Sequence, residues 1–123
     1  MMYLCDTCIL IDYLRGVVTI KDKLVVDRLE NLGMSSVTMM ELLVGAYNKK
    51  ETTLIRKAFN EITVIEISDD ISRLATQLIE KYSKSHNLLI PDALIAATSI
   101  ITLTPLYTLN VTDFNYLPEL KLV

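Results

Sequence analysis

The sequence contains little glycine, proline or histidine and no tryptophan. Three glycines and three prolines in 123 residues leave few places for long loops or linkers. The hydrophobic share of 51% against 22% charged residues excludes a disordered or fibrous chain. A chain of this length buries about two thirds of its unfolded surface. We therefore expect a single domain over residues 1–123, with no internal repeat.

A membrane segment and a signal peptide are both missing from the pattern. The longest charge-free run lies between Asp92 and Asp113, but Pro105 interrupts it and threonines dilute it. This run predicts a buried helix followed by a buried strand. No basic residue precedes the apolar N-terminal residues, and Asp6 comes too early for a signal peptide. A cytoplasmic location is therefore expected.

Basic residues are not in excess, and this argues against a simple basic face for nucleic acid. The net charge is −3 and the sequence pI is about 5.1, whereas phosphate-binding proteins usually carry a basic surface. The count changes meaning where acids surround divalent metal ions, because bound cations add positive charge that the sequence does not show.

Cysteine and histidine are scarce. The two cysteines stand together as Cys5-Asp6-Thr7-Cys8, and such a pair before a helix could be a redox dithiol because the helix dipole lowers the pKa of a thiol. The preferred interpretation is two small buried side chains in a reducing compartment, since Cys5 falls inside an expected strand. The single histidine, His86, follows an expected helix and is not predicted to be a general base.

Short apolar segments alternate with longer segments of helical periodicity. Strands are expected at residues 3–5, 34–37, 63–67 and 106–109, and residues 120–123 could add an edge strand. Helices are expected at residues 9–14, 20–32, 38–44, 51–61, 68–85 and from 91 onward. The alternation predicts an α/β sandwich with a mainly parallel sheet of four to five strands.

One carboxylate, Asp92, interrupts the very apolar stretch Leu88–Thr98. An isolated ionised carboxylate that leaves water must be paired, bound to a metal or neutralised. Pro91-Asp92 also fits a helix start, where proline and an acid are both favoured. A helix-starting role and a shared cation both remain open from this stretch alone.

Two further acids stand beside apolar sequence. Asp6 follows the first expected strand, and open α/β sheets bind ligands at the carboxyl ends of their strands; a helix cap is the alternative. Glu41 follows Thr38 by three residues, as in a capping box, although its apolar neighbours argue against a purely solvent-facing role. A parallel sheet brings Asp6 and Glu41 to one edge, but spacing alone does not place Asp92 there.

Four groups of residues carry a family resemblance. They are Leu4–Thr7 with Leu10–Leu14, Ser35–Thr38 with Glu41, Leu42 and Gly45, Ile90–Ala97, and Thr108–Phe114 before Pro118–Leu120. In this order and spacing, over nearly the full length, the chain resembles PIN-domain ribonucleases, and most closely the VapC-type toxins of type II toxin–antitoxin pairs.

The resemblance implies a PIN-like three-layer α/β/α sandwich and a metal-dependent endoribonuclease that hydrolyses RNA phosphodiester bonds. Asp6, Glu41 and Asp92 match the three core acids and are expected to be catalytic residues that hold Mg²⁺ or Mn²⁺, directly or through water. Such a set suits Mg²⁺, which prefers oxygen ligands and retains several waters. A metal-bound water is the expected nucleophile.

One position departs from the family. Asn110 stands where many PIN domains have a fourth acid, so the second metal site is more doubtful than the first. Asn110 and the hydroxyls of Thr7 and Thr108 are expected to orient water or phosphate, and Asp113 in the next turn is an alternative source of the missing charge.

The resemblance also implies partners: an RNA substrate, a second copy in a homodimer, and a VapB-type antitoxin in an apolar groove. Leu24, Val25, Leu43 and Tyr47 are compatible with such a groove, and core packing explains them equally well. Three alternatives remain: a PIN nuclease of RNA processing without an antitoxin, a catalytically weak RNA- or protein-binding module, and, more distantly, a thiol oxidoreductase.

Overall fold

Four short strands form an all-parallel sheet in the order β3-β2-β1-β4 in the computed structural model, which describes residues 1–123. The strands are β1 (Leu4–Cys5), β2 (Gly33–Ser35), β3 (Thr63–Ile65) and β4 (Leu106–Tyr107). In register, Leu4 is opposite Gly33 on one side and Leu106 on the other. The edge strand considered for residues 120–123 is reduced to a single parallel bridge between Leu122 and Leu106. The expected parallel α/β sheet is confirmed.

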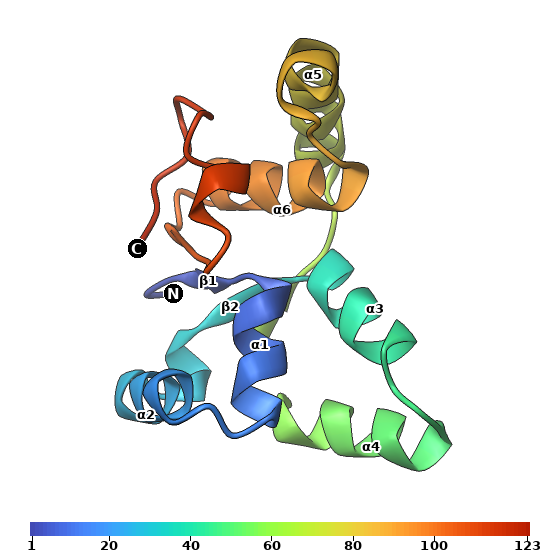
Figure 1. The fold of residues 1–123 in the computed structure, drawn as a ribbon, viewed down its shortest axis with the longest axis vertical. Helices are drawn as coiled ribbons and strands as arrows, with labels where there is room; N and C mark the ends of the chain where they lie inside the picture. The colour runs from blue at the N-terminus through green and yellow to red at the C-terminus, as the bar shows by residue number, and fades with distance from the viewer.

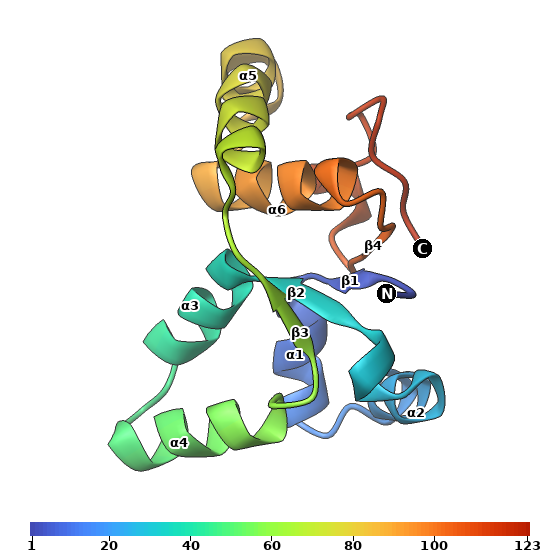
Figure 2. The ribbon, with the colours of Figure 1, turned by 180° about the vertical axis from the view of Figure 1, so that it is seen from behind.

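Six helices connect and cover the strands (Figures 1 and 2). They are α1 (Thr7–Leu14), α2 (Val18–Asp27), α3 (Ser36–Val44), α4 (Lys49–Ala58), α5 (Asp69–His86) and α6 (Ile90–Ile101), with short 3-10 turns η1 (Leu29–Asn31) and η2 (Val111–Asp113). The single helix expected over residues 20–32 is wrong, because Arg28 takes a positive φ of 69° and separates α2 from η1. A positive φ ends a right-handed helix.

The sheet has a separate apolar core on each face. Tyr3 and Cys5 pack with α1, α2, α3 and α4, whereas Leu4 between them packs with α5 and α6. This alternation follows from the two-residue period of a strand. Figure 1 shows α1, α2 and α4 below the strands and α5 and α6 above them. The expected three-layer α/β/α sandwich is therefore confirmed.

The parallel strands place their carboxyl ends along one edge of the sheet. Asp6 follows β1 directly, Ser35 ends β2, and Thr108 follows β4. Helices α1 and α3 begin at this edge, and α6 packs against both α3 and β2. The start of α6, which carries Asp92, is thereby brought toward the first two strands.

The charge-free stretch between Asp92 and Asp113 forms most of α6 and all of β4, as expected. None of the helices combines the length and apolar character that crossing a bilayer requires.

Leu103, in the turn between α6 and β4, gives a testable consequence for stability. It is 91% exposed and has a φ of 52°. A left-handed conformation costs a residue with a Cβ about 1–2 kcal/mol, and glycine avoids most of that cost while losing more backbone entropy on folding. We expect Leu103→Gly to raise the free energy of unfolding by about 0.5–1 kcal/mol in urea denaturation. Leu103→Ala is the control, and equal stability of the two variants would contradict the strain.

Candidate active site at the carboxyl edge of the sheet

Asp6 is held by donors from two elements. It is the N-cap of α1 and only 5% exposed. The Thr7 backbone N–H donates to Oδ1 at 2.8 Å, and the Thr108 hydroxyl donates to Oδ2 at 2.7 Å. A cap needs only the first of these bonds. The second, from a residue 102 positions away, fixes the carboxylate against the end of β4.

Glu41 reaches the same edge from α3. Its exposed side chain accepts a hydrogen bond of 2.7 Å from the Thr7 hydroxyl, which also lies 3.1 Å from the hydroxyl of Thr38. The capping box that the sequence offered is wrong. Ser35 caps α3 through the Val37 N–H at 3.1 Å, and Glu41 lies near the end of that helix. Thr7 therefore connects Glu41 to the start of α1 beside Asp6.

Asp92 is the third residue of α6 and is partly buried. Burial and, after it, the negative charges of Asp6, Asp113 and Glu41 in that order together raise the pKa of its carboxyl to about 6. No hydrogen bond or cation acts to lower this pKa. The structure therefore brings Asp92 within electrostatic range of both other core acids, which spacing alone did not predict.

Of the residues expected to support the three acids, Thr108 is buried, whereas Asn110 and Asp113 lie on the surface. Thr108 is buried, and its hydroxyl accepts a hydrogen bond of 3.0 Å from the Asn110 backbone N–H while donating to Asp6. Asn110 is exposed and helps to orient Thr108 through its backbone. Asp113, in η2, is exposed and close enough to act on Asp92 more strongly than Glu41 does.

No basic side chain neutralises this group of acids. The ion pairs of the protein are Lys23–Asp27, Arg28–Glu30 and Arg73–Asp70, all of them elsewhere. In the structure as it stands, no group of three His, Cys, Asp or Glu side chains is close enough together to hold a metal ion. An all-oxygen set that lacks a counter-charge fits Mg²⁺, which commonly uses one or two carboxylates and keeps its remaining positions for water and phosphate.

Two residues at this edge of the sheet were not predicted from the sequence to belong to the site. Thr38, assigned as a helix cap, is fully buried and faces Thr7 instead. Tyr116 has a buried hydroxyl without a hydrogen-bond partner, and its pKa is raised by burial and then by Asp92 and Asp113. Neither placement has a signal in the sequence, because both depend on how separate helices and loops pack.

The two cysteines are free. Burial raises the pKa of Cys5 to about 12 and also raises that of Cys8, whose Sγ lies 3.5 Å from Asp6 Oδ2. Low-pKa thiolates are the reactive form in redox dithiols, so the raised values support buried, unreactive side chains.

A thiol titration tests this interpretation. At pH 8 a pKa near 12 in place of 9.0 leaves Cys5 with a thiolate fraction roughly a thousandfold smaller. We expect Ellman's reagent to modify Cys5 at least about a hundredfold more slowly in the native protein than in guanidinium, and Cys8 more slowly by a smaller factor. Equal rates in the two conditions would restore the dithiol hypothesis.

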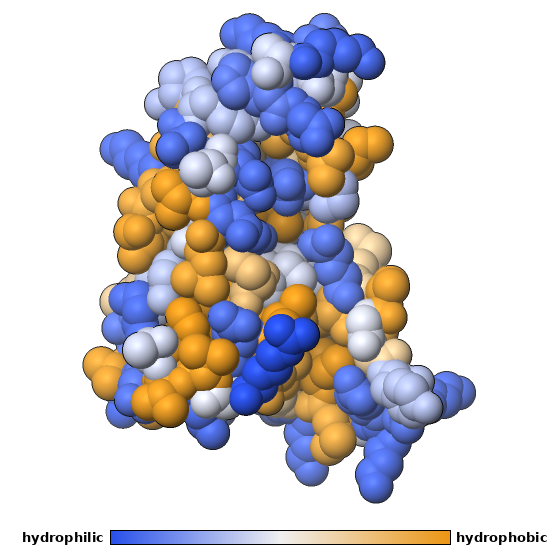
Figure 3. Space-filling model, in the orientation of Figure 1, coloured by the Kyte–Doolittle hydropathy of each residue, from blue (hydrophilic) through white to orange (hydrophobic).

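A groove between α1, α3 and α4 includes Glu41 in its lining. It has a volume of about 380 Å³, and its lining residues are Ile11, Leu14, Arg15, Glu41, Leu42, Gly45, Glu51 and Ile55. Figure 3 shows hydrophobic and hydrophilic residues mixed on the face of the molecule seen in Figure 1. Leu24, which was compatible with a groove or with core packing, is fully buried in the core, because α2 turns it toward the sheet. Val25 and Tyr47 are 57% and 89% exposed.

Comparison with known proteins agrees with this geometry. The family model described as "PIN domain" matches residues 3–111. The chain is 34% identical over 121 residues to Ribonuclease VapC10 of Mycobacterium tuberculosis, covering 98% of this chain and 91% of that protein. It is 32% identical to Ribonuclease VapC19 of the same organism, covering 98% of each.

A solved structure is similar over nearly the same range. The Klebsiella pneumoniae chain from a structure described as a toxin–antitoxin complex is 32% identical, has a TM-score of 0.80, and is matched over 94% of its length by 96% of this chain. The likeness therefore extends across both cores and the acidic edge.

Proposed function

The chain belongs to the PIN domain family and, within it, to the VapC ribonucleases, and from this premise we propose that it is a metal-dependent endoribonuclease and the toxin of a toxin–antitoxin pair. The observation that carries the metal-dependent part is the convergence of Asp6, Glu41 and Asp92 at one sheet edge with no basic residue among them. These three acids are the proposed metal ligands and catalytic residues.

The three acids have different roles in this proposal. Asp6 is fixed by two hydrogen bonds and presents a preorganised carboxylate. Glu41 is exposed and tied by a single bond to Thr7, so it can move toward an ion or a water molecule. Asp92 has an elevated pKa and no donor, so it gains the most from a cation.

Mg²⁺ or Mn²⁺ at this site would lower the pKa of a bound water and offset negative charge on the scissile phosphate. Around it, the chain's own groups hold the geometry. Thr7 and Thr108 orient Glu41 and Asp6, and donors of this kind are usually necessary to keep ligating carboxylates in place. Asn110 is uncharged where many PIN domains have a fourth acid, although Asp113 adds a negative charge in the next turn. We therefore propose that one ion is firmly held.

We place the antitoxin in the groove between α1, α3 and α4. Glu41 lines this groove and also accepts the Thr7 hydrogen bond, so an occupant of the groove would lie against the acidic edge. Arg15 and Glu51 in the same lining offer charged contacts of both signs. A homodimer and a cytoplasmic location complete the proposal.

The experiment is cleavage of total cellular RNA by the purified chain, freed of any partner, in Mg²⁺, in Mn²⁺ and in chelator. We expect cleavage in either metal, none in chelator, and inhibition when the product of the neighbouring antitoxin gene is added. Cleavage that continues in excess chelator would contradict metal dependence. A folded protein that binds metal and cleaves no RNA would favour the binding module.

The neutral Asn110, in place of a fourth acid, keeps a catalytically weak binding module as a candidate. A PIN nuclease of RNA processing without an antitoxin is the other candidate, with the same acids. It predicts the same metal-dependent cleavage with no inhibition by the neighbouring gene product. Light scattering of the purified chain with and without that product distinguishes the two, since only the toxin forms a stable complex.

A further inference from the structure

Three aromatic rings form a cluster beside the acidic edge. They belong to Tyr82 and His86, one turn apart at the end of α5, and to Tyr116 after η2. The rings of His86 and Tyr116 are stacked, with centroids 4.1 Å apart and planes at 15°. Tyr82 meets both at steep angles, with centroids 5.7 Å from His86 and 5.3 Å from Tyr116. Because Tyr82 is about equally far from both, it lies beside the stacked pair. Neither tyrosine covers the outer face of the His86 imidazole.

The exposure of the rings is uneven. His86 is exposed, whereas Tyr82 and Tyr116 are partly buried. The two tyrosines therefore support the imidazole from below and from the side, and the Ser85 hydroxyl lies 2.8 Å from its Nδ1. An exposed flat ring held on a packed support is preorganised for stacking, because little side-chain entropy remains to be lost.

Tyr116 is the member of this aromatic cluster that lies nearest the acids. Its ring lies on His86, while its buried hydroxyl has no partner and lies in the field of Asp92 and Asp113. Tyr116 thus lies between His86 and the acids. An RNA strand bound at the acids would have to continue past Tyr116 to reach the outer face of His86.

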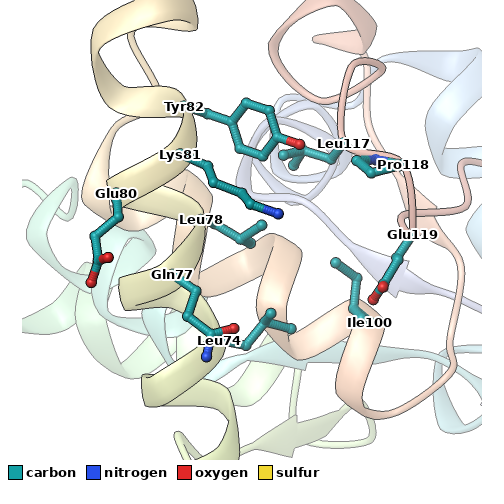
Figure 4. Close-up of a pocket in the computed structure, with 10 residues that line it drawn as sticks. All are labelled: Leu74, Gln77, Leu78, Glu80, Lys81, Tyr82, Ile100, Leu117, Pro118 and Glu119. Carbon is teal, nitrogen blue, oxygen red and sulfur yellow. The ribbon is translucent and has the colours of Figure 1, made fainter.

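Positive charge lies on the same end of α5. Lys81 and Lys84 are exposed, and neither takes part in an ion pair. Figure 4 shows the Lys81 side chain extending from α5 toward the C-terminal segment beside Tyr82, while Glu80 points away on the other side of the helix. Lys81 therefore adds an unpaired positive charge beside Tyr82, whereas Lys84, two residues from both Tyr82 and His86, lies on the opposite side of the helix.

Building on the nuclease function proposed above, we propose that the outer face of His86 binds an unpaired base of the RNA substrate, and that Lys81 contacts a phosphate next to it. Single-stranded RNA exposes base faces that stack on His and Tyr rings, whereas paired bases in a duplex do not. His86 is thus a proposed base-binding position outside the acidic edge. Lys81 adds affinity without sequence preference.

The test measures RNA binding in excess chelator, so that no cleavage occurs. The probe is a short unstructured RNA containing a fluorescent adenine analogue, whose emission is quenched by stacking, and a hairpin duplex of similar composition is the comparison. We expect His86→Ala to weaken binding of the single strand by roughly 5- to 50-fold and to remove the quenching, with little effect on the duplex. His86→Phe keeps a flat ring and should bind within about threefold of the wild type.

Lys84 supplies a matched control on the same helix. Lys81→Ala should weaken binding and flatten its salt dependence, whereas Lys84→Ala removes the same charge from the opposite side of α5 and should change neither. Unchanged binding and quenching in His86→Ala would overturn the stacking site, even if the wild type cleaves RNA. A wild type that cleaves no RNA but shows the His86-dependent quenching would instead refute the nuclease function and leave the stacking site supported.

Discussion

Replacing Asp92 by Asn is expected to make the metal-free protein more stable at pH 7.5 and to reduce its RNA cleavage by more than about a hundredfold. The pKa of Asp92 is about 6 in the folded protein, above its ordinary value of 3.8. The folded state therefore binds the proton more tightly than the unfolded state. As pH rises from about 4 to about 6 the unfolded chain ionises first, and the folded protein loses stability until Asp92 is also ionised.

An uncharged asparagine removes that penalty. Partial exposure of Asp92 screens the effect, and a first-turn acid also gains from the helix dipole, so we expect a net gain of about 1 kcal/mol, or about 3–5 °C in Tm. The gain should disappear below pH 4, where the wild-type carboxyl is protonated. It should reverse in saturating Mg²⁺, which stabilises only the wild type.

Thermal unfolding followed by circular dichroism, at pH 4 and pH 7.5 and with and without Mg²⁺, measures this pattern. Asp70→Asn, an exposed first-turn acid of α5, is the control and should change Tm little. An Asp92→Asn variant less stable than the wild type at pH 7.5 in chelator would mean that the carboxylate is paired, and would remove the electrostatic reason for a cation at this position.

Thr108→Val is expected to lower RNA cleavage by about 10- to 100-fold and the free energy of unfolding by about 1–3 kcal/mol. The Thr108 hydroxyl donates to Asp6 Oδ2 at 2.7 Å and accepts from the Asn110 N–H at 3.0 Å. Valine has nearly the same shape, so the change leaves a buried carboxylate oxygen and a backbone donor without their partner. The remaining contact of Asp6 Oδ2, Cys8 Sγ at 3.5 Å, is a weak donor.

The control is Thr108→Ser, which keeps the hydroxyl and should retain activity within about threefold. Mn²⁺ affinity, measured by titration calorimetry, should fall in Thr108→Val in parallel with activity, because the proposed role of Thr108 is to hold Asp6. Full activity and full metal affinity in Thr108→Val would show that Asp6 needs no such support.

The sequence predicted best those features that depend on local order. The strand before Asp6 is short and apolar, and apolar residues at helical spacing follow it at once. The position of Asp6 at the end of a strand could therefore be predicted. The alternation of strand and helix segments along the chain predicted the parallel sheet in the same way, and the structure has a separate core on each of its faces.

Features that depend on which of two residues caps a helix, or on how helices pack, were harder to predict from the sequence. Ser35 and Thr38 both fit a helix cap, and Ser35 caps the helix because β2 ends there, which moves Glu41 from the first turn of α3 to its last. Asp92 reaches the other acids only because α6 packs on α3 and β2. The apolar side chain of Leu24 was compatible with a groove and equally with a buried core face, and only the packing of α2 showed that it is buried.

An anomalous difference map from crystals of the partner-free protein soaked in Mn²⁺ would show directly whether these acids hold the metal. We expect one strong peak at the carboxyl edge of the sheet, coordinated by Asp6 and Asp92 and joined to Glu41 directly or through water, and no such peak in Asp92→Asn. A map with no peak at this edge, from protein that cleaves RNA in Mn²⁺, would show that the metal acts elsewhere. Asp6 and Asp92 would then serve only to begin α1 and α6.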